Sequence, residues 1–105
     1  MSATLPARGD VVWLSMDPTE GREQRGHRPH LVLSDARMAR AMGLVIVVPM
    51  TSAERRWATR VRLAEGSYAI GEQPRTAHVE RITRIEHTGY DVAPVVAVIG
   101  RLIGA

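Results

Sequence analysis

Short runs of β-branched and aliphatic residues, separated by polar loops, dominate the hydropathy pattern of this chain. The run from Val11 to Met16 is apolar on both alternating faces, as expected for a strand buried on two sides or closed into a small barrel. Residues 44–50 form a continuous β-branched run, which predicts a central strand. Shorter strands are predicted at residues 30–33, 59–63, 68–73 and 83–88.

Brief helices interrupt this strand pattern. Ser34 or Asp35 can cap a short helix over residues 36–42, and Gly43 can end it. Residues 77–82 can form one or two helical turns. Several short strands with brief helices predict a mainly β (α+β) fold, a compact barrel or half-barrel.

The C-terminal segment predicts an unusually apolar helix over residues 95–103, which Pro94 can start. Arg101 stands nearly alone among the polar positions of this helix. A small barrel can cover one helical face, but not most of a helix. The excess apolar surface therefore predicts a partner surface, most simply in a homodimer, with deep burial inside the monomer as the alternative.

Composition limits the class of protein. A chain of 105 residues with 45% hydrophobic and 24% charged residues predicts one soluble globular domain over residues 1–105. There is no cysteine, no secretory signal and no apolar run near the ~18 residues needed to span a membrane. We expect a cytoplasmic protein with no membrane association. All 14 basic residues are Arg, which favours phosphate recognition but is equally typical of a genome rich in G and C.

Residues 9–29 carry the most informative motif. A strand-like Gly-Asp-Val-Val-Trp leads to Asp-Pro-Thr and then to Gly-x-Glu-Gln-x-Gly-x-Arg-Pro, a polar loop that ends at Arg28 and Pro29. The loop carries a carboxylate, an amide, a His and three Arg, which suit an anionic or flexible polar ligand. This order of motifs closely resembles the MazF/PemK family of toxin endoribonucleases, and three later blocks of the chain follow in the family order.

The resemblance implies both a fold and an activity. The fold would be an SH3-like barrel with a C-terminal helix, assembled as a homodimer. The activity would be cleavage of single-stranded RNA by 2′-hydroxyl attack, leaving a 2′,3′-cyclic phosphate and a 5′-hydroxyl, with no metal and no cofactor. The protein partner would be an antitoxin whose acidic, flexible tail competes for the RNA groove.

Two positions match the catalytic pair of the family. Arg28 aligns with the catalytic arginine of the Gly-x-Arg-Pro motif, and Pro29 restricts it to extended geometry. Its guanidinium would stabilise the phosphorane-like dianion, unless it only caps loop carbonyls. Thr51 aligns with the second catalytic residue in the Pro-x-Thr-Ser sequence that ends the central strand. Its hydroxyl would donate to a nonbridging phosphate oxygen, with Ser52 as a second donor.

The third block is Glu-Gln-Pro-Arg-Thr at residues 72–76. Glu72 aligns with an acidic residue proposed as general base in the PemK-like branch. That branch usually has an Arg two positions earlier and a His in the first loop, where this chain has Ile70 and Arg22. The identity of the acid and base therefore stays open, and an ion pair between Glu72 and Arg75 is the structural alternative.

The remaining candidates are polar or aromatic groups that can hold RNA. Trp57 can stack on a base or pack onto its own domain, whereas Trp13 is expected in the core. His27 can also carry a proton near neutral pH. The four histidines are not spaced for a metal site, so none is predicted. The residues expected to bind RNA are Arg22, Glu23, Gln24, His27, Ser52, Trp57, Gln73 and Arg75.

Two other functions compete with this interpretation. A related toxin on the same fold poisons DNA gyrase, but that branch depends on a C-terminal Trp-Gly-Ile, and this chain ends in Leu-Ile-Gly-Ala. The other alternative is a noncatalytic RNA-binding module that kept the groove and lost turnover.

Overall fold

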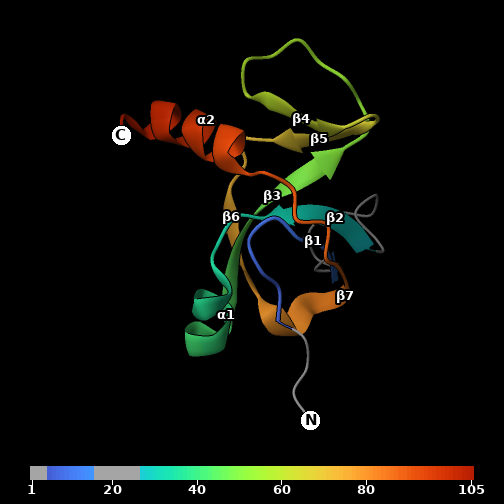
Figure 1. Cartoon of the computed structure of the whole chain (residues 1–105), viewed down its shortest axis with the longest axis vertical. Coiled ribbons are helices and arrows are strands. Elements are labelled where there is room, and N and C mark those ends of the chain that lie inside the picture. Colours follow the sequence, from blue (N-terminus) through green and yellow to red (C-terminus); the bar gives the residue numbers. More distant parts are fainter. Residues whose placement is uncertain (1–4, 16–26) are drawn as a thin grey trace.

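A computed structural model of the chain describes residues 5–15 and 27–105. Within these residues, seven strands form an antiparallel sheet accompanied by two α-helices (Figure 1). The elements are β1 (Val11–Ser15), β2 (His27–Val32), α1 (Ala36–Met42), β3 (Leu44–Thr51), β4 (Arg60–Ala64), β5 (Ser67–Ile70), β6 (Arg75–His78), a 3-10 turn (Val79–Arg81), β7 (Ile82–Glu86) and α2 (Ala93–Ile103).

The strand order is β4-β5-β3-β2-β1-β7, and β6 pairs with β3 beside this path. The path ends at β4 and β7, which do not pair with each other in the described part of the chain. The prediction of a mainly β, α+β fold is confirmed. The sheet is curved but open, so the expected barrel is a half-barrel rather than a closed one.

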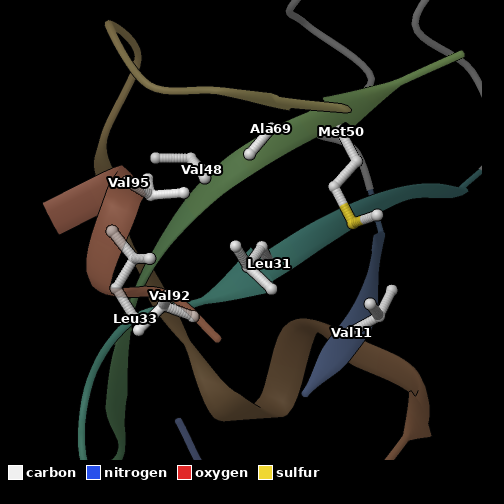
Figure 2. Close-up of a cluster of buried hydrophobic side chains, with 8 residues drawn as sticks. All are labelled: Val11, Leu31, Leu33, Val48, Met50, Ala69, Val92 and Val95. Atoms are coloured by element: carbon white, nitrogen blue, oxygen red, sulfur yellow. The ribbon is translucent and has the colours of Figure 1, made fainter. Parts of the chain in front are cut away.

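The two faces of the sheet carry separate hydrophobic clusters. The first cluster, which includes residues of α2, is shown in Figure 2 and consists of Val11, Leu31, Leu33, Val48, Met50, Ala69, Val92 and Val95. The second cluster, on the opposite face, consists of Val12, Leu14, Val32, Ala39, Val45, Val47 and Ala77. Consecutive residues of the central strands thus enter different clusters. This confirms that the apolar run starting at Val11 belongs to a strand buried on both faces, although Met16 lies outside the described residues.

The edge of β3 that faces away from β2 is shared between two strands. Its first half pairs with β6, with Val47 opposite Arg75, and its last two residues pair with β5, with Thr51 opposite Tyr68. Pro49 lies between the two halves. The Leu33 N–H donates to the Ile46 carbonyl at 2.8 Å, so even-numbered residues of β3 bond toward β2 and odd-numbered ones toward β5 and β6. Pro49 has no N–H to offer that edge, and the edge divides there.

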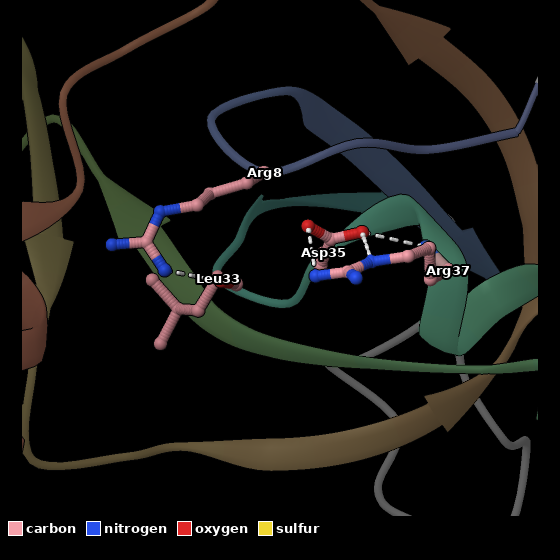
Figure 3. Close-up of polar contacts among 4 residues, drawn as sticks. All are labelled: Arg8, Leu33, Asp35 and Arg37. Atoms are coloured by element: carbon pink, nitrogen blue, oxygen red, sulfur yellow. Dashed lines mark hydrogen bonds and ion pairs between the residues drawn. The ribbon is translucent and has the colours of Figure 1, made fainter.

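Helix α1 begins and ends as its sequence predicts. The Asp35 carboxylate accepts the Arg37 backbone N–H at 2.8 Å and also pairs with the Arg37 guanidinium at 3.0 Å (Figure 3). Gly43 ends the helix with a φ of 68°, in the left-handed region that glycine tolerates.

Helix α2 also confirms its prediction, with Pro94 in the first turn. Val95 and Val98 are buried, while Val96, Leu102 and Ile103 are 41%, 55% and 72% exposed. The helix therefore carries more apolar surface than its own domain covers. No helix among the described residues is long and apolar enough to cross a membrane.

Three sequence predictions require correction. Residues 77–82 form one helical turn and not two, at Val79–Arg81, because Ala77 and His78 belong to β6, which pairs with β3. The strand predicted over 68–73 ends at Ile70, where a turn carries the chain from β5 to β6. The strand predicted at 30–33 begins at His27, so the Arg-Pro pair lies inside β2. In the first and third cases, strand pairing outweighed local propensity.

Candidate active site

Pairing between β2 and β3 ends at His30, the residue that follows the Arg28–Pro29 pair in sequence. The last paired residues are His30 and Pro49. In every pair between these two strands, the two residue numbers add to 79. The next hydrogen-bonded pair would join residues 29 and 50, but Pro29 has no N–H to donate to the Met50 carbonyl. The two strands therefore separate beyond His30.

A surface pocket of about 390 Å³ opens where the two strands separate. It is lined by Arg28, Pro29, Met50, Thr51, Ser52, Gly66 and Ser67. Continuing the register by two residues places Arg28 opposite Thr51, since 28 and 51 also add to 79. Both side chains leave the same face of the sheet, because residues paired across antiparallel strands share a face. The two predicted catalytic residues are thus brought together.

Two contacts hold the main chain at Arg28. Its register partner in β1 is Leu14, and its carbonyl accepts a hydrogen bond from the His30 ring Nδ1 at 3.0 Å. The following proline limits Arg28 to extended backbone. These constraints fix the position from which the half-buried Arg28 side chain starts.

The two hydroxyl groups at the end of β3 suit the donors that were predicted. The Thr51 Oγ1 accepts the Ala53 backbone N–H at 3.1 Å, which leaves the hydroxyl hydrogen to donate to a ligand. Thr51 is half-buried and Ser52 is exposed, and both line the pocket. An anion in the pocket would meet these hydroxyls beside a guanidinium.

Arg75 extends the positive charge along the same face. It pairs with Val47, a residue of the second cluster, so its side chain also leaves the face of Arg28. A small pocket beside it is lined by Leu14, Ser15, Arg75, Thr76, Ala77, His78 and Arg81. With two Arg, one His and no carboxylate in its lining, this pocket also suits an anion.

Other predicted site residues lie elsewhere. His27 precedes Arg28 in β2, so its side chain leaves the opposite face, where its Nδ1 lies 3.3 Å from the Thr83 hydroxyl. Glu72 and Gln73 lie in the turn between β5 and β6, on the far edge of β3, and do not line the Arg28 pocket. One Glu72 carboxylate oxygen is buried without a hydrogen bond.

The two tryptophans differ from each other. The Trp57 side chain is 55% exposed, and the Arg60 guanidinium lies 5.1 Å from its ring centroid. The exposed ring has one face near a cation, and stacking of Trp57 on a base stays a prediction. Trp13 is only partly buried, against the first cluster, and Arg84 lies 4.7 Å from its ring centroid. Trp13 thus lies in a strand and packs against the core as expected, although it is only partly buried.

Three residues that the sequence predicts to bind RNA lie outside the described part of the chain: Arg22, Glu23 and Gln24. In residues 5–15 and 27–105, no group of three or more His, Cys, Asp or Glu side chains is placed to hold a metal ion. The sequence did not point to Gly66 and Ser67, which line the pocket where β4 turns into β5. It also did not point to His30, whose ring contacts the Arg28 carbonyl. The His-Arg-Pro-His order places His30 on the same strand face as Arg28 only once β2 is known to begin at His27.

Comparison with known proteins agrees with this geometry. A family model described as a PemK-like, MazF-like toxin of type II toxin–antitoxin systems matches residues 7–101. The chain belongs to this family. The matched range includes every residue that lines the Arg28 pocket.

Individual members of the PemK/MazF family show the extent of the likeness. The endoribonuclease toxin MazF of Escherichia coli K12 is 42% identical over 52 residues, 50% of this chain and 47% of that protein. The endoribonuclease PemK of Escherichia coli is 47% identical over 45 residues, 43% of this chain and 34% of that protein. The chain thus spans about half or less of the length of the curated relatives it matches.

A solved structure matches over almost the full length. The MazE–MazF complex of Deinococcus radiodurans contains a chain with a TM-score of 0.82 and 30% sequence identity to this one. The match covers 97% of this chain and 98% of that one. The half-barrel with its C-terminal helix is therefore the family fold.

Proposed function

We propose that this chain is the toxin of a type II toxin–antitoxin pair and cuts single-stranded RNA in the Arg28–Thr51 pocket. The observation that carries the proposal is the pocket beyond the last pair of β2 and β3, whose lining includes both Arg28 and Thr51. The family membership and the endoribonuclease names of the relatives support it.

The groups in the pocket suit a reaction that needs no metal. The ribose 2′-oxygen attacks the adjacent phosphorus and the bond to the 5′-oxygen breaks, giving a 2′,3′-cyclic phosphate and a 5′-hydroxyl. Arg28 stabilises the dianionic transition state, and Thr51 and Ser52 donate hydrogen bonds to its nonbridging oxygens. Arg75 binds phosphate along the same face.

The base and the acid of this reaction are less well supported by the geometry. Glu72 remains the family candidate for the base, but it lies across β3 from Arg28. An acid–base role for Glu72 requires the substrate to extend over the face that carries Arg75.

The proposal includes two protein contacts. The exposed apolar side chains Val96, Leu102 and Ile103 of α2 suit a homodimer interface. The arginines around the pocket suit the acidic tail of an antitoxin, and a chain of a MazE–MazF complex shares the fold of this one. The toxin and its RNA substrate would meet in the cytoplasm.

The test is incubation of the purified protein with a long single-stranded RNA in EDTA, followed by mapping of the fragment ends. We expect cuts at defined sites with cyclic-phosphate ends. Arg28→Ala should lower the rate more than ~100-fold, the scale of losing a transition-state electrostatic contact. The matched control is Arg37→Ala, which removes an exposed arginine of α1 and should leave the rate unchanged.

Three results would contradict the proposal. A well-folded Arg28→Ala protein that cleaves normally would exclude this pocket. RNA that is bound but not cut would favour the noncatalytic module. Intact RNA together with inhibition of DNA gyrase would favour the gyrase-directed toxin.

A further inference from the structure

His30 is a buried histidine that the proposed reaction does not use. Only 2% of its surface is exposed, and Asp10 is the other fully buried polar residue in the described part of the chain. In the register of the sheet, His30 pairs with Val12 of β1 and with Pro49 of β3. An imidazole in such apolar surroundings has to be explained by what its ring nitrogens contact.

The ring lies at the boundary between the second cluster and the Arg28 pocket. As a residue two positions from Arg28 on the same strand, it shares the face of Arg28. The charged groups that face it are Arg28 of its own strand and Arg75 of β6. The neighbouring residues of β1 and β3 on this face are not ionisable: Val12, Leu14, Val47, Pro49 and Thr51.

The hydrogen bond of His30 defines its protonation. Its Nδ1 lies 3.0 Å from the Arg28 carbonyl oxygen, and a carbonyl oxygen can only accept. Nδ1 therefore carries a hydrogen, and the neutral ring has its lone pair on Nε2. Burial lowers the pKa of His30 below its ordinary value of 6.5, and the charges of Arg75 and Arg28 lower it further, against the bond to the Arg28 carbonyl. The neutral ring is thus the resident form near pH 7.

We propose that neutral His30 is a positioning residue for Arg28. This role rests on the proposed nuclease function. In the described part of the chain, the ladder between β2 and β3 ends at His30, while Leu14 of β1 still pairs with Arg28. The His30 ring adds a second tether to the same carbonyl group and reduces the motion of the main chain that carries the guanidinium.

Protonation would undo this arrangement. A third positive charge beside Arg28 and Arg75, in apolar surroundings, is costly to keep buried. The ring would leave for solvent and release the Arg28 carbonyl. The cleavage rate should therefore be constant above the pKa of His30 and fall as the pH drops below it.

The first test is nuclear magnetic resonance of the ring nitrogens in the whole protein. At pH 8 we expect the His30 ring to carry its hydrogen on Nδ1, and on titration its pKa should lie below 6.5. Arg75→Gln removes one facing charge, so the His30 pKa should rise. A ring with its hydrogen on Nε2, or a His30 pKa unchanged by Arg75→Gln, would overturn the assignment.

The second test separates positioning from folding. His30→Leu removes the donor but suits the apolar site, so it should lower kcat roughly tenfold, with KM and thermal stability little changed. His30→Asn can still donate to the Arg28 carbonyl and should recover most of kcat, while its rate no longer falls at acid pH. The control is His87→Gln, a half-exposed histidine paired with Asp10 away from the pocket, which should keep the wild-type pH profile.

The outcomes distinguish the two proposals. If the wild type does not cleave RNA, the proposed function fails, and the nitrogen spectra still decide whether His30 holds Arg28. If the wild type cleaves and His30→Leu matches it in kcat and in pH profile, the function stands and the positioning role is wrong.

Discussion

The two edges of β3 are both interrupted at a proline, with different results. On the β2 edge, Pro29 ends the pairing and a pocket opens between Arg28 and Thr51. On the other edge, Pro49 lies where the pairing of β3 changes from β6 to β5, and the turn that contains Gly71 joins these two strands. A β-carbon on Gly71 would lie 2.7 Å from the Thr59 carbonyl oxygen and 3.0 Å from Val98 of α2.

The difference between these two edges shows when the loss of a backbone N–H creates a binding site. Each of the two prolines removes one N–H from an edge of β3. Among the described residues, the pocket on the β2 edge is lined by a guanidinium and hydroxyls, which can bind an anion. The break at Pro49 is structural, and the break at Pro29 is the candidate for chemistry.

Among variants that test the difference between the two edges of β3, the largest effect is expected from Gly71→Ala. The new β-carbon clashes with Thr59 and Val98, which should cost about 2 kcal/mol of unfolding free energy. Urea denaturation measures this loss. The matched control is Gly100→Ala in α2, where the β-carbon would meet only Ala105, 4.0 Å away, and should gain about 0.5–1 kcal/mol. Cleavage per folded molecule should stay unchanged in both variants, and its loss in Gly71→Ala would show that the far edge also serves the reaction.

A smaller effect is expected at the end of β3. Thr51→Val keeps the shape of the side chain but removes the donor, and should lower kcat/KM roughly tenfold, with recovery in Thr51→Ser. Glu72→Gln, on the far edge, should change it less than about threefold, because Glu72 does not line the pocket. Single-turnover cleavage of a short RNA measures both. A larger loss in Glu72→Gln than in Thr51→Val would restore Glu72 to the centre of the mechanism.

The smallest effect is expected from Pro29→Ala, which supplies the missing N–H. Residue 29 can then donate to the Met50 carbonyl, so the strands pair further and the pocket narrows. We expect the rate to fall only about threefold, since Arg28 and Thr51 remain opposite each other. Hydrogen exchange should show a protected amide at residue 29. An amide that exchanges freely would mean that the proline is not what separates the strands.

Much of the site could be predicted because its residues belong to short local motifs. Arg28 stands in Arg-Pro and Thr51 in Pro-x-Thr-Ser, and in each motif the proline removes a backbone donor from the sheet. Glu72 was harder to assign, since its motif describes a turn without saying which edge of β3 the turn covers. His30 was missed as a participant because its contact with the Arg28 carbonyl depends on the depth at which β2 is buried.

The sequence by itself determined the α+β class, both helices, the caps of α1 and the two-faced burial of the central strands. It also determined which candidate site residues match the motifs of a known family. Periodicity and capping are properties of neighbouring residues, so they can be read locally. Only the tertiary structure decided that residues 75–78 form a strand, that Pro29 and not Pro49 opens a pocket, and that Arg28 lies opposite Thr51. These facts depend on strand register, which is set by contacts between residues far apart in the chain.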